Sequence, residues 1–565
     1  MTAVTNTPLR RDARLIQWLL PAGGVTVGIL LLAGPLLATL ARSLLVWTDG
    51  QASLSLANFS ALVNSSHFSE AVINTLICGV GATIASCVLG FYLAWIVART
   101  NVPGRGWLEI LNLIPFFLSP YVGAVSWIYL AAPHSGLLQH FFQSQFGLSL
   151  EFLNIYSLGG VIFVLALFYT PYIYLFLLAP LRQMDGALED AARVHGAGFG
   201  YTLRHITVPL VMPAMLSGAL IVFVTSAGLF DVPLALAAPK GIHTIPTEIF
   251  SYVQYPADFG AASAIGVMVV IVTVVLTLFH HRYIGRRRYE TVSGKGYRPR
   301  LINLRPWALA GVLILEIVYL GGAVLLPTVA LILVALSSIW TGQFNPQFAT
   351  LQNFHYVSFE YSLTRGAIGN SLILAIVGAT LSVGIALFQA YYLNRGRRRG
   401  RGFIDAVLSL PLGIPSIILG LGFLILGIRT PLYSTLTIIL IAYIARFFPF
   451  AMRNISAMFL AINPELEQSA RASGASWWQT MRFVLLPLLR PALISAWLML
   501  FVIFVRELGA TILLYAQGTE TISVALVLLS ERNFGYVAAL ALIQLCLLLA
   551  AFVLLRVART SIVEI

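Results

Sequence analysis

Long apolar stretches separated by short polar segments dominate the chain. A helix of roughly 20 apolar residues crosses a hydrocarbon layer of about 30 Å, and many stretches here reach that length. The pattern predicts an all-α membrane protein with about 12 transmembrane helices. We expect them near residues 15–46, 71–97, 107–131, 157–180, 208–237, 259–281, 306–340, 367–393, 403–428, 434–458, 485–514 and 534–556.

Two polar stretches within this pattern are near copies of each other. EDAARVHGAGFGYTLRHITVPLVMPA begins at Glu189, and EQSARASGASWWQTMRFVLLPLLRPA begins at Glu467, 278 residues later. About 11 of the 26 aligned positions are identical. Self-similarity at a fixed offset indicates an internal duplication. We therefore predict a first domain, a basic cytoplasmic linker and a second domain, at 1–283, 284–305 and 306–565.

Each copy reads as a polar helix, a glycine and a second short helix that leads into an apolar span. We call these segments the elbows, at about 185–209 and 463–487. Asp185 and Asn463 are good N-cap residues, and Pro464 suits the first helical position of the second copy. Gly196 and Gly474 tolerate the left-handed backbone that ends a helix. The sequence therefore predicts a helix–glycine–helix unit in each elbow.

Prolines stand at matching places inside two of the predicted membrane helices. Pro115 and Pro120 lie in the third helix, and Pro411 and Pro415 lie in the ninth. A proline lacks an N–H donor and leaves a carbonyl group free, which lipid cannot satisfy. We expect both helices to be kinked or broken and to face other protein.

Composition excludes a soluble globular domain, because 59% of the residues are hydrophobic, 10% are charged and the mean hydropathy is +0.89. The net charge of +13 does not indicate nucleic acid, since the basic residues gather on one predicted side of the membrane. Arg99, the run from Arg395 and residues 280–305 illustrate this positive-inside bias. For the last segment, binding of anionic lipid is the alternative function. We expect a lipid bilayer, no nucleic-acid partner and two cytoplasmic termini.

The three cysteines give no indication of a metal site. Cys78, Cys87 and Cys546 all lie in apolar runs without the spacing of metal ligands. We expect them to be small buried hydrophobic residues. No metal site is predicted.

The two elbows resemble the EAA loop of the permease subunits of binding-protein-dependent ABC importers, the type I importer family. The family pattern of E-A-A, a glycine and a closing hydrophobic–proline pair is matched by EDAARVHG with Pro209. EQSARASG with Pro487 also matches it, with Ser469 in place of an alanine. The resemblance covers essentially the whole chain. It implies two tandem six-helix permease domains, inserted with the same orientation.

In that family, each elbow is a coupling helix that docks on a separate ATP-hydrolysing subunit. The resemblance implies a homodimeric ABC ATPase inside, a periplasmic solute-binding protein outside, and a place in the bacterial inner membrane. The sequence contains no GxxxxGK[ST] phosphate loop, so we expect no enzyme activity and no cofactor, with ATP and Mg²⁺ used by the partner. The implied coupling residues are Glu189, Ala191, Ala192, Gly196, Pro209, Glu467, Ala470, Gly474 and Pro487.

Charged residues within predicted spans are costly and indicate a solute path. Asp231 stands in GLFDVP, and Arg506 and Glu507 stand in FVRELGAT. Neighbouring residues on a helix point about 100° apart, so the last two cannot both face one partner without a break. The alternative is that these charges lie at helix ends near the outer headgroups.

The tandem fusion, FDVP and RELGAT most resemble ferric-iron importers. Permeases for thiamine, 2-aminoethylphosphonate, polyamines and oxyanions have related architectures and remain alternatives. An ion-driven secondary transporter also has a 6+6 arrangement. That class predicts charged motifs between the second and third helices, where this chain has only RTNVPGRG, and it gives no reason for paired elbows.

Overall fold

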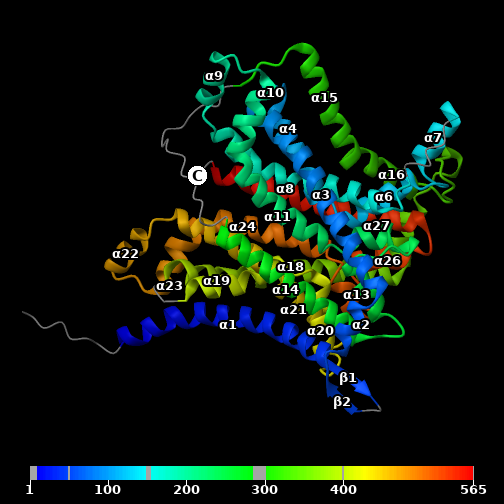
Figure 1. Ribbon diagram of the computed structural model, residues 1–565. Helices are drawn as coiled ribbons and strands as arrows, with labels where there is room; N and C mark the ends of the chain where they lie inside the picture. The colour runs from blue at the N-terminus through cyan, green and yellow to red at the C-terminus, as the bar shows by residue number, and fades with distance from the viewer. Residues whose placement is uncertain (1–8, 49–50, 148–153, 284–300, 397–399, 564–565) are drawn as a thin grey trace, which may run out of the picture.

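The computed structural model describes residues 9–48, 51–147, 154–283, 301–396 and 400–563. These residues form a helical protein with one β-hairpin (Figure 1). Most of the predicted linker, residues 284–300, lies outside the described residues. We therefore describe the two halves of the chain on either side of it.

The first half runs from α1 to α14. Its elements are α1 (Leu9–Leu44), β1 (Leu45–Thr48), β2 (Gln51–Leu54), α2 (Ala57–Val63), α3 (Ser66–Arg99), α4 (Arg105–Leu111), α5 (Ile114–Phe117), α6 (Pro120–Ala131), α7 (Leu137–Phe146), α8 (Leu158–Gln183), α9 (Gly186–Val194), α10 (Phe199–Thr202), the π-helical turn η2 (Leu203–Thr207), α11 (Val208–Ala227), α12 (Asp231–Leu236), the 3₁₀ turn η3 (Ala238–Lys240), α13 (Ile245–Val253) and α14 (Phe259–Tyr283).

The second half repeats this order, without a hairpin among its described residues. Its elements are α15 (Pro306–Leu320), η4 (Gly321–Leu325), α16 (Leu326–Ala335), η5 (Pro346–Phe348), α17 (Gln352–His355), η6 (Tyr356–Glu360), α18 (Ser362–Arg395), α19 (Arg401–Ser409), η7 (Leu410–Leu412), α20 (Ser416–Gly427), α21 (Leu436–Ala461), α22 (Glu465–Ala472), α23 (Trp477–Thr480), η8 (Met481–Leu485), α24 (Leu486–Val505), α25 (Thr511–Leu514), α26 (Ile522–Ser530) and α27 (Phe534–Val563).

The apolar helices follow the predicted order. Within the described ranges, nine are long and apolar enough to cross a membrane, or up to eleven if each of two bent pairs is one span. The apolar part of α14 is shorter and occupies the sixth predicted position. The bent pairs are the two proline-containing helices: α4–α5 meets α6 at 94°, and α19–η7 meets α20 at 96°. The predicted breaks at the prolines are confirmed.

Two predicted spans are wrong at their outer ends. The span expected at 208–237 stops at Ala227, and Asp231 starts the separate helix α12. The span expected at 485–514 stops at Val505, and α25 starts only at Thr511. In the first case Pro233 stands in the first turn of α12, where the N–H that it lacks would have no helical partner. In the second case the Glu507 side chain accepts hydrogen bonds from the start of α25.

The duplication is visible in repeated contacts. Asn74 on α3 donates to the carbonyl of His243 at 2.9 Å, and Asn370 on α18 donates to the carbonyl of Glu520 at 2.9 Å. The next residue in each half carries a hydroxyl group. Thr75 accepts a hydrogen bond from the first N–H of α13, and Ser371 accepts one from the first N–H of α26, both at 2.8 Å. Each half therefore fastens its α13- or α26-containing loop to its second membrane helix in the same way.

The two halves interlock through their first membrane helices. Helix α1 packs along α18 and α20 of the second half, where Gln389 donates to the carbonyl of Gly24 at 3.0 Å. Conversely, Tyr319 on α15 donates to the carbonyl of Leu167 on α8 at 3.2 Å, and α16 packs on α6. Figure 1 shows α1 alongside the helices of the second half.

We expect Gly422→Ala to loosen this interlock. A Cβ at Gly422 would lie 2.4 Å from the Pro35 carbonyl oxygen, so α1 would have to move away from α20. Overpacking of this kind lowers the free energy of unfolding by about 1–3 kcal/mol, and thermal denaturation in detergent would measure it. Gly384→Ala in α18 is the matched control, since its Cβ would meet nothing within 4 Å and alanine favours a helix. Equal denaturation temperatures for the two variants would contradict this packing.

Candidate functional site

Both elbows have the predicted helix–glycine–helix geometry. The Asp185 carboxylate accepts a hydrogen bond from the N–H of Ala187 at 2.9 Å at the start of α9. Gly196 and Gly474 end the polar helices with φ of +83° and +89°, the left-handed region that glycine adopts without strain.

The predicted start of the polar helix in the second elbow is wrong by one residue. Asn463 Oδ1 accepts a bond from the N–H of Glu465 at 3.0 Å, and α22 starts at Glu465. Pro464, predicted at the first helical position, therefore lies just before the first residue of α22, although its φ of −57° and ψ of −22° are already helical. The Asp185 carboxylate makes the equivalent bond two residues ahead, so the two capping turns match.

Among the predicted coupling residues in the polar helices, the two glutamates differ from the rest. Glu189 is 4% exposed and Glu467 is 6% exposed, whereas Ala191 and the two glycines are exposed and Ala192 and Ala470 are half-buried. The glutamate side chains point into the protein, so the surface that each elbow offers is made by its other residues.

An arginine at the end of α3 holds the first glutamate. Arg99 is fully buried; its Nη2 donates to Oε2 of Glu189, and its Nη1 donates to the carbonyl of Met184 at 3.3 Å. The hydroxyl group of Thr207 donates to the other carboxylate oxygen at 2.9 Å. The first elbow is thus tied both to α3 and to the start of its own membrane helix.

The second elbow repeats the tie with one difference. Arg395, at the end of α18, donates from Nε to Oε1 of Glu467 at 2.5 Å and from Nη2 to the carbonyl of Ile462 at 3.0 Å. Leu485 stands where the first elbow has its threonine, and the guanidinium group lies 5.6 Å from the centre of the Phe459 ring. An aromatic contact takes the place of a hydroxyl bond.

Sequence reasoning assigned Arg99 and Arg395 only to the positive-inside bias. Their spacing of 296 residues equals that between Asn74 and Asn370. That shared offset is the signal that could have marked the two arginines as equivalent. It could not have named Glu189 as a partner 90 residues away.

The second short helix of each elbow continues directly into a membrane helix. A single apolar helix runs from α10 to α11, and another from α23 to α24. Each contains a π-helical turn before its proline, in which the N–H of the residue preceding Pro209 or Pro487 bonds five residues back. Because proline donates no bond, the wider turn accommodates it without a break.

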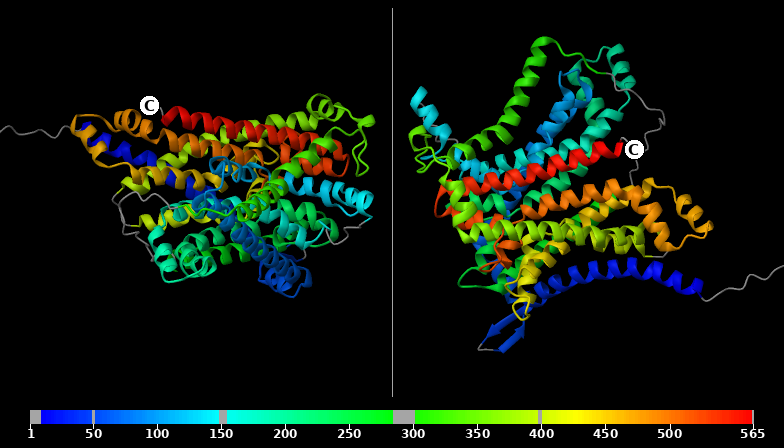
Figure 2. Two further views of the ribbon diagram at one scale, coloured as in Figure 1. Left: turned by 90° about the horizontal axis from the view of Figure 1, so that it is seen from above. Right: turned by 180° about the vertical axis from the view of Figure 1, so that it is seen from behind.

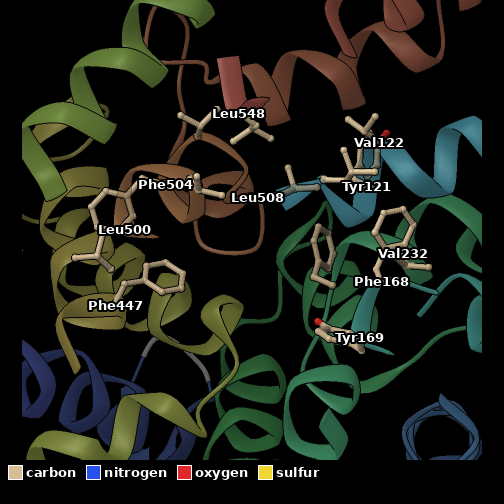
Figure 3. Close-up of a cluster of buried hydrophobic side chains, with 14 of the residues drawn as sticks. Tyr121, Val122, Phe168, Tyr169, Val232, Phe447, Leu500, Phe504, Leu508 and Leu548 are labelled. Atoms are coloured by element: carbon tan, nitrogen blue, oxygen red, sulfur yellow. The ribbon is translucent and has the colours of Figure 1, made fainter. Parts of the chain in front are cut away.

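A central cavity of about 160 Å³ lies between the two halves. Asp231, Arg506 and Glu507, the three residues predicted for the solute path, all line it, together with Arg446. Figure 3 shows a cluster of buried hydrophobic side chains to which the lining residues Phe168, Tyr169, Phe447 and Leu508 belong. The end of α24 at Val505 allows both Arg506 and Glu507 to reach this cavity, although a continuous helix would separate them.

Arg506 reaches the broken helix of the other half. Its Nη1 donates to the carbonyls of Phe116 and Leu118, at 2.7 and 3.1 Å. Pro120 has no N–H, so the Phe116 carbonyl four residues earlier lacks its helical donor. The arginine supplies that donor.

Arg446 does the same in the second half, and sequence reasoning missed it. Its Nη1 donates to the carbonyl of Pro411, which lies four residues before Pro415 and lacks a donor for the same reason. Its Nε is buried without a hydrogen-bond partner. The signal that could have found it is an arginine in the middle of the predicted span 434–458, seven residues before Arg453.

Among the described residues, no group of three or more His, Cys, Asp or Glu side chains is placed to hold a metal ion. The predicted burial of the cysteines is confirmed for Cys78, while Cys87 is half-buried and Cys546 is exposed. The prediction is wrong for Cys546 because it lies on a face of α27 that does not pack against other helices.

Comparison with known families gives two separate matches along the chain. The family described as "Binding-protein-dependent transport system inner membrane component" matches residues 86–289 and again residues 382–562. The chain belongs to this family. It is an ABC importer permease with two tandem permease domains, as its elbows predicted, and a transport component rather than an enzyme. An ion-driven secondary transporter is ruled out by this membership.

Individual relatives of the permease carry two kinds of assignment. It is 28% identical over 457 residues to a Haemophilus influenzae protein assigned as the ferric transport system permease FbpB 1, covering 78% of this chain and 69% of that protein. It is 27% identical to the ferric transport system permease FbpB of Actinobacillus pleuropneumoniae, of which it spans 63%. A Salmonella paratyphi A protein assigned as the 2-aminoethylphosphonate permease PhnV is 31% identical over 238 residues, 41% of this chain and 89% of that protein.

Among solved structures, the permease is similar to a chain of a bacterial ABC transporter involved in the import of the acidic polysaccharide alginate. The TM-score is 0.40 and the identity is 19%, over 50% of this chain and 98% of that chain.

Proposed function

We propose that this permease forms the translocation path of an ATP-driven importer of ferric iron. The observation that carries the proposal is the extent of the ferric relatives, which align with 78% of this chain and so with both of its halves. We place the permease in the bacterial inner membrane, with both termini in the cytoplasm and a periplasmic solute-binding protein on the opposite side.

We further propose that the elbows dock on a homodimeric ABC ATPase, which uses ATP and Mg²⁺. Figure 1 and the right view of Figure 2 support this, because α9 and α22 lie at the same end of the molecule, away from α7 and the hairpin. Each elbow also exposes apolar side chains, with Val194 85% exposed and Leu466 47% exposed. Exposed apolar groups beside polar ones suit a protein–protein contact.

Reconstitution tests the importer and its solute together. We expect uptake of ferric iron into liposomes only when the permease, its ATPase, its binding protein and ATP are all present. Omission of the binding protein is the matched control, because the ATPase would still assemble with the permease. Failure of the ATPase to copurify with the permease would contradict the coupling role of the elbows.

2-Aminoethylphosphonate is the second candidate solute. The 31% identity to the Salmonella protein is higher than the identity to the ferric relatives, but it extends over only 41% of this chain. Uptake of this phosphonate without uptake of iron, in the same liposomes, would favour it. Uptake of iron alone would decide against it.

A further inference from the structure

The charged groups of the central cavity are not joined to one another in direct ion pairs. Arg446 and Arg506 both line it, as do Asp231 and Glu507. In the part of the chain that the structure describes, no ion pair within 4.0 Å joins either arginine to either acid. A charge inside a membrane protein is costly unless it is paired or contacts a solute. The hydrogen bonds of each group therefore show which of them is free to contact a solute.

Glu507 is committed to the protein itself. Its Oε1 accepts a bond from the N–H of Ala510 at 2.8 Å. Its Oε2 accepts bonds from the N–H and the hydroxyl group of Thr511, at 3.2 and 2.5 Å. The Tyr443 hydroxyl group lies 2.7 Å from the same threonine hydroxyl. The carboxylate is therefore held toward the start of α25 and makes no direct contact with either arginine.

The arginines, by contrast, keep donors to spare. A guanidinium group has five N–H donors. Arg506 uses Nη1 for two carbonyls, and Arg446 uses Nη1 for one while its Nε has no partner. Neutral carbonyls satisfy some of the donors but contribute no negative charge. The cavity wall therefore carries two guanidinium groups suited to an oxyanion.

Asp231 adds a carboxyl group to this wall. It stands in the first turn of α12, is 6% exposed, and forms no ion pair with either arginine among the described residues. A site with two guanidinium groups and one separate carboxyl group matches a solute that joins an oxyanion to a cationic centre. An oxyanion chelate of ferric iron and a zwitterionic aminophosphonate share that chemistry, whereas a polyamine lacks the oxyanion.

We propose that Arg446 and Arg506 form an oxyanion-binding site in the translocation path, with Asp231 facing the cationic part of the same solute. The inference rests on the proposed importer function and names the class of its cargo. Iron would cross this cavity as an oxyanion complex, with the oxyanion held by the two guanidinium groups.

Equilibrium binding to the purified permease in lipid nanodiscs tests the site without ATPase or binding protein. The probes are ferric citrate, 2-aminoethylphosphonate and putrescine, titrated by calorimetry. We expect ferric citrate or the phosphonate to bind and putrescine not to bind. Arg446→Gln removes the charge and leaves a neutral amide at the position of the arginine Nε. We expect it to weaken binding about tenfold or more, the factor that loss of a charge-assisted hydrogen bond produces.

Arg446→Lys retains the charge and should weaken binding less than Arg446→Gln does. Arg453→Gln is the control, since that arginine pairs with Asp405 at 3.1 Å and does not line the cavity. Equal weakening by the Lys and Gln variants, binding of putrescine, or binding of no probe would each overturn the oxyanion site. None of these results would affect ATPase copurification, so failure of the site and failure of the proposed importer are distinguishable.

Discussion

Replacement of both elbow glycines by valine should reduce ATP-dependent uptake to less than about a tenth while leaving membrane insertion intact. Gly196 and Gly474 have φ of +83° and +89°, and a β-branched residue held in such a conformation costs about 1–3 kcal/mol. Nothing lies within 4 Å of a Cβ at either position. The effect would therefore come from backbone strain that changes the angle between the two short helices, not from a clash in the core.

The matched control for the glycine pair is Gly198→Val. This residue also has open space around its Cβ, but its φ of −70° and ψ of 167° are extended and suit valine. Uptake into liposomes, copurified ATPase and yield in the membrane fraction would be measured together. Uptake by the double variant equal to that of the control would count against coupling through the elbows.

Arg99→Ala should be the most destabilising single change in the elbow region. It would leave the Glu189 carboxylate buried with only the Thr207 hydroxyl group as a side-chain partner. Removal of one member of a buried ion pair costs about 3–5 kcal/mol. Thermal denaturation of the purified permease should show this loss, and uptake should fall with it because the first elbow would no longer be tied to α3.

Two further variants test whether the loss comes from leaving the Glu189 charge buried without its partner. Arg453→Ala breaks an ion pair whose two side chains are 42% and 32% exposed, and should cost about 0–1 kcal/mol. Arg99→Met with Glu189→Leu removes both charges, and should recover much of the stability lost by the single change. If Arg99→Ala were no worse than the exposed control, the buried tie would not stabilise the elbow.

The sequence was most informative where the physics is local or repeated. Hydrophobic length placed the membrane helices, and the constant offset of 278 residues showed the two domains and both elbows. The N-cap of α9 and the left-handed glycines follow from residue type alone. The prolines marked where the third and ninth helices break.

Features that depend on distant contacts were missed. Arg99 and Glu189 lie 90 residues apart, and no local pattern shows that they meet. The separation of α12 and α25 from their membrane helices depends on groups such as Glu507, whose bonds turn the chain.

The hairpin of β1 and β2 was missed although it was predictable from local sequence. Asp-Gly separates the two strands in the sequence and favours a tight turn.

The placement of α1 has a consequence for the order in which the chain is made. Its partners α18 and α20 are translated some 350 to 400 residues later, which takes roughly 20–80 s at about 5–20 residues per second. During that time the first helix has its partner α14 of the same half but lacks the surface that α18 and α20 later provide. The amino-terminal half therefore cannot reach its final packing during synthesis, and a ribosome that stalls in the linker would leave α1 exposed to membrane quality control.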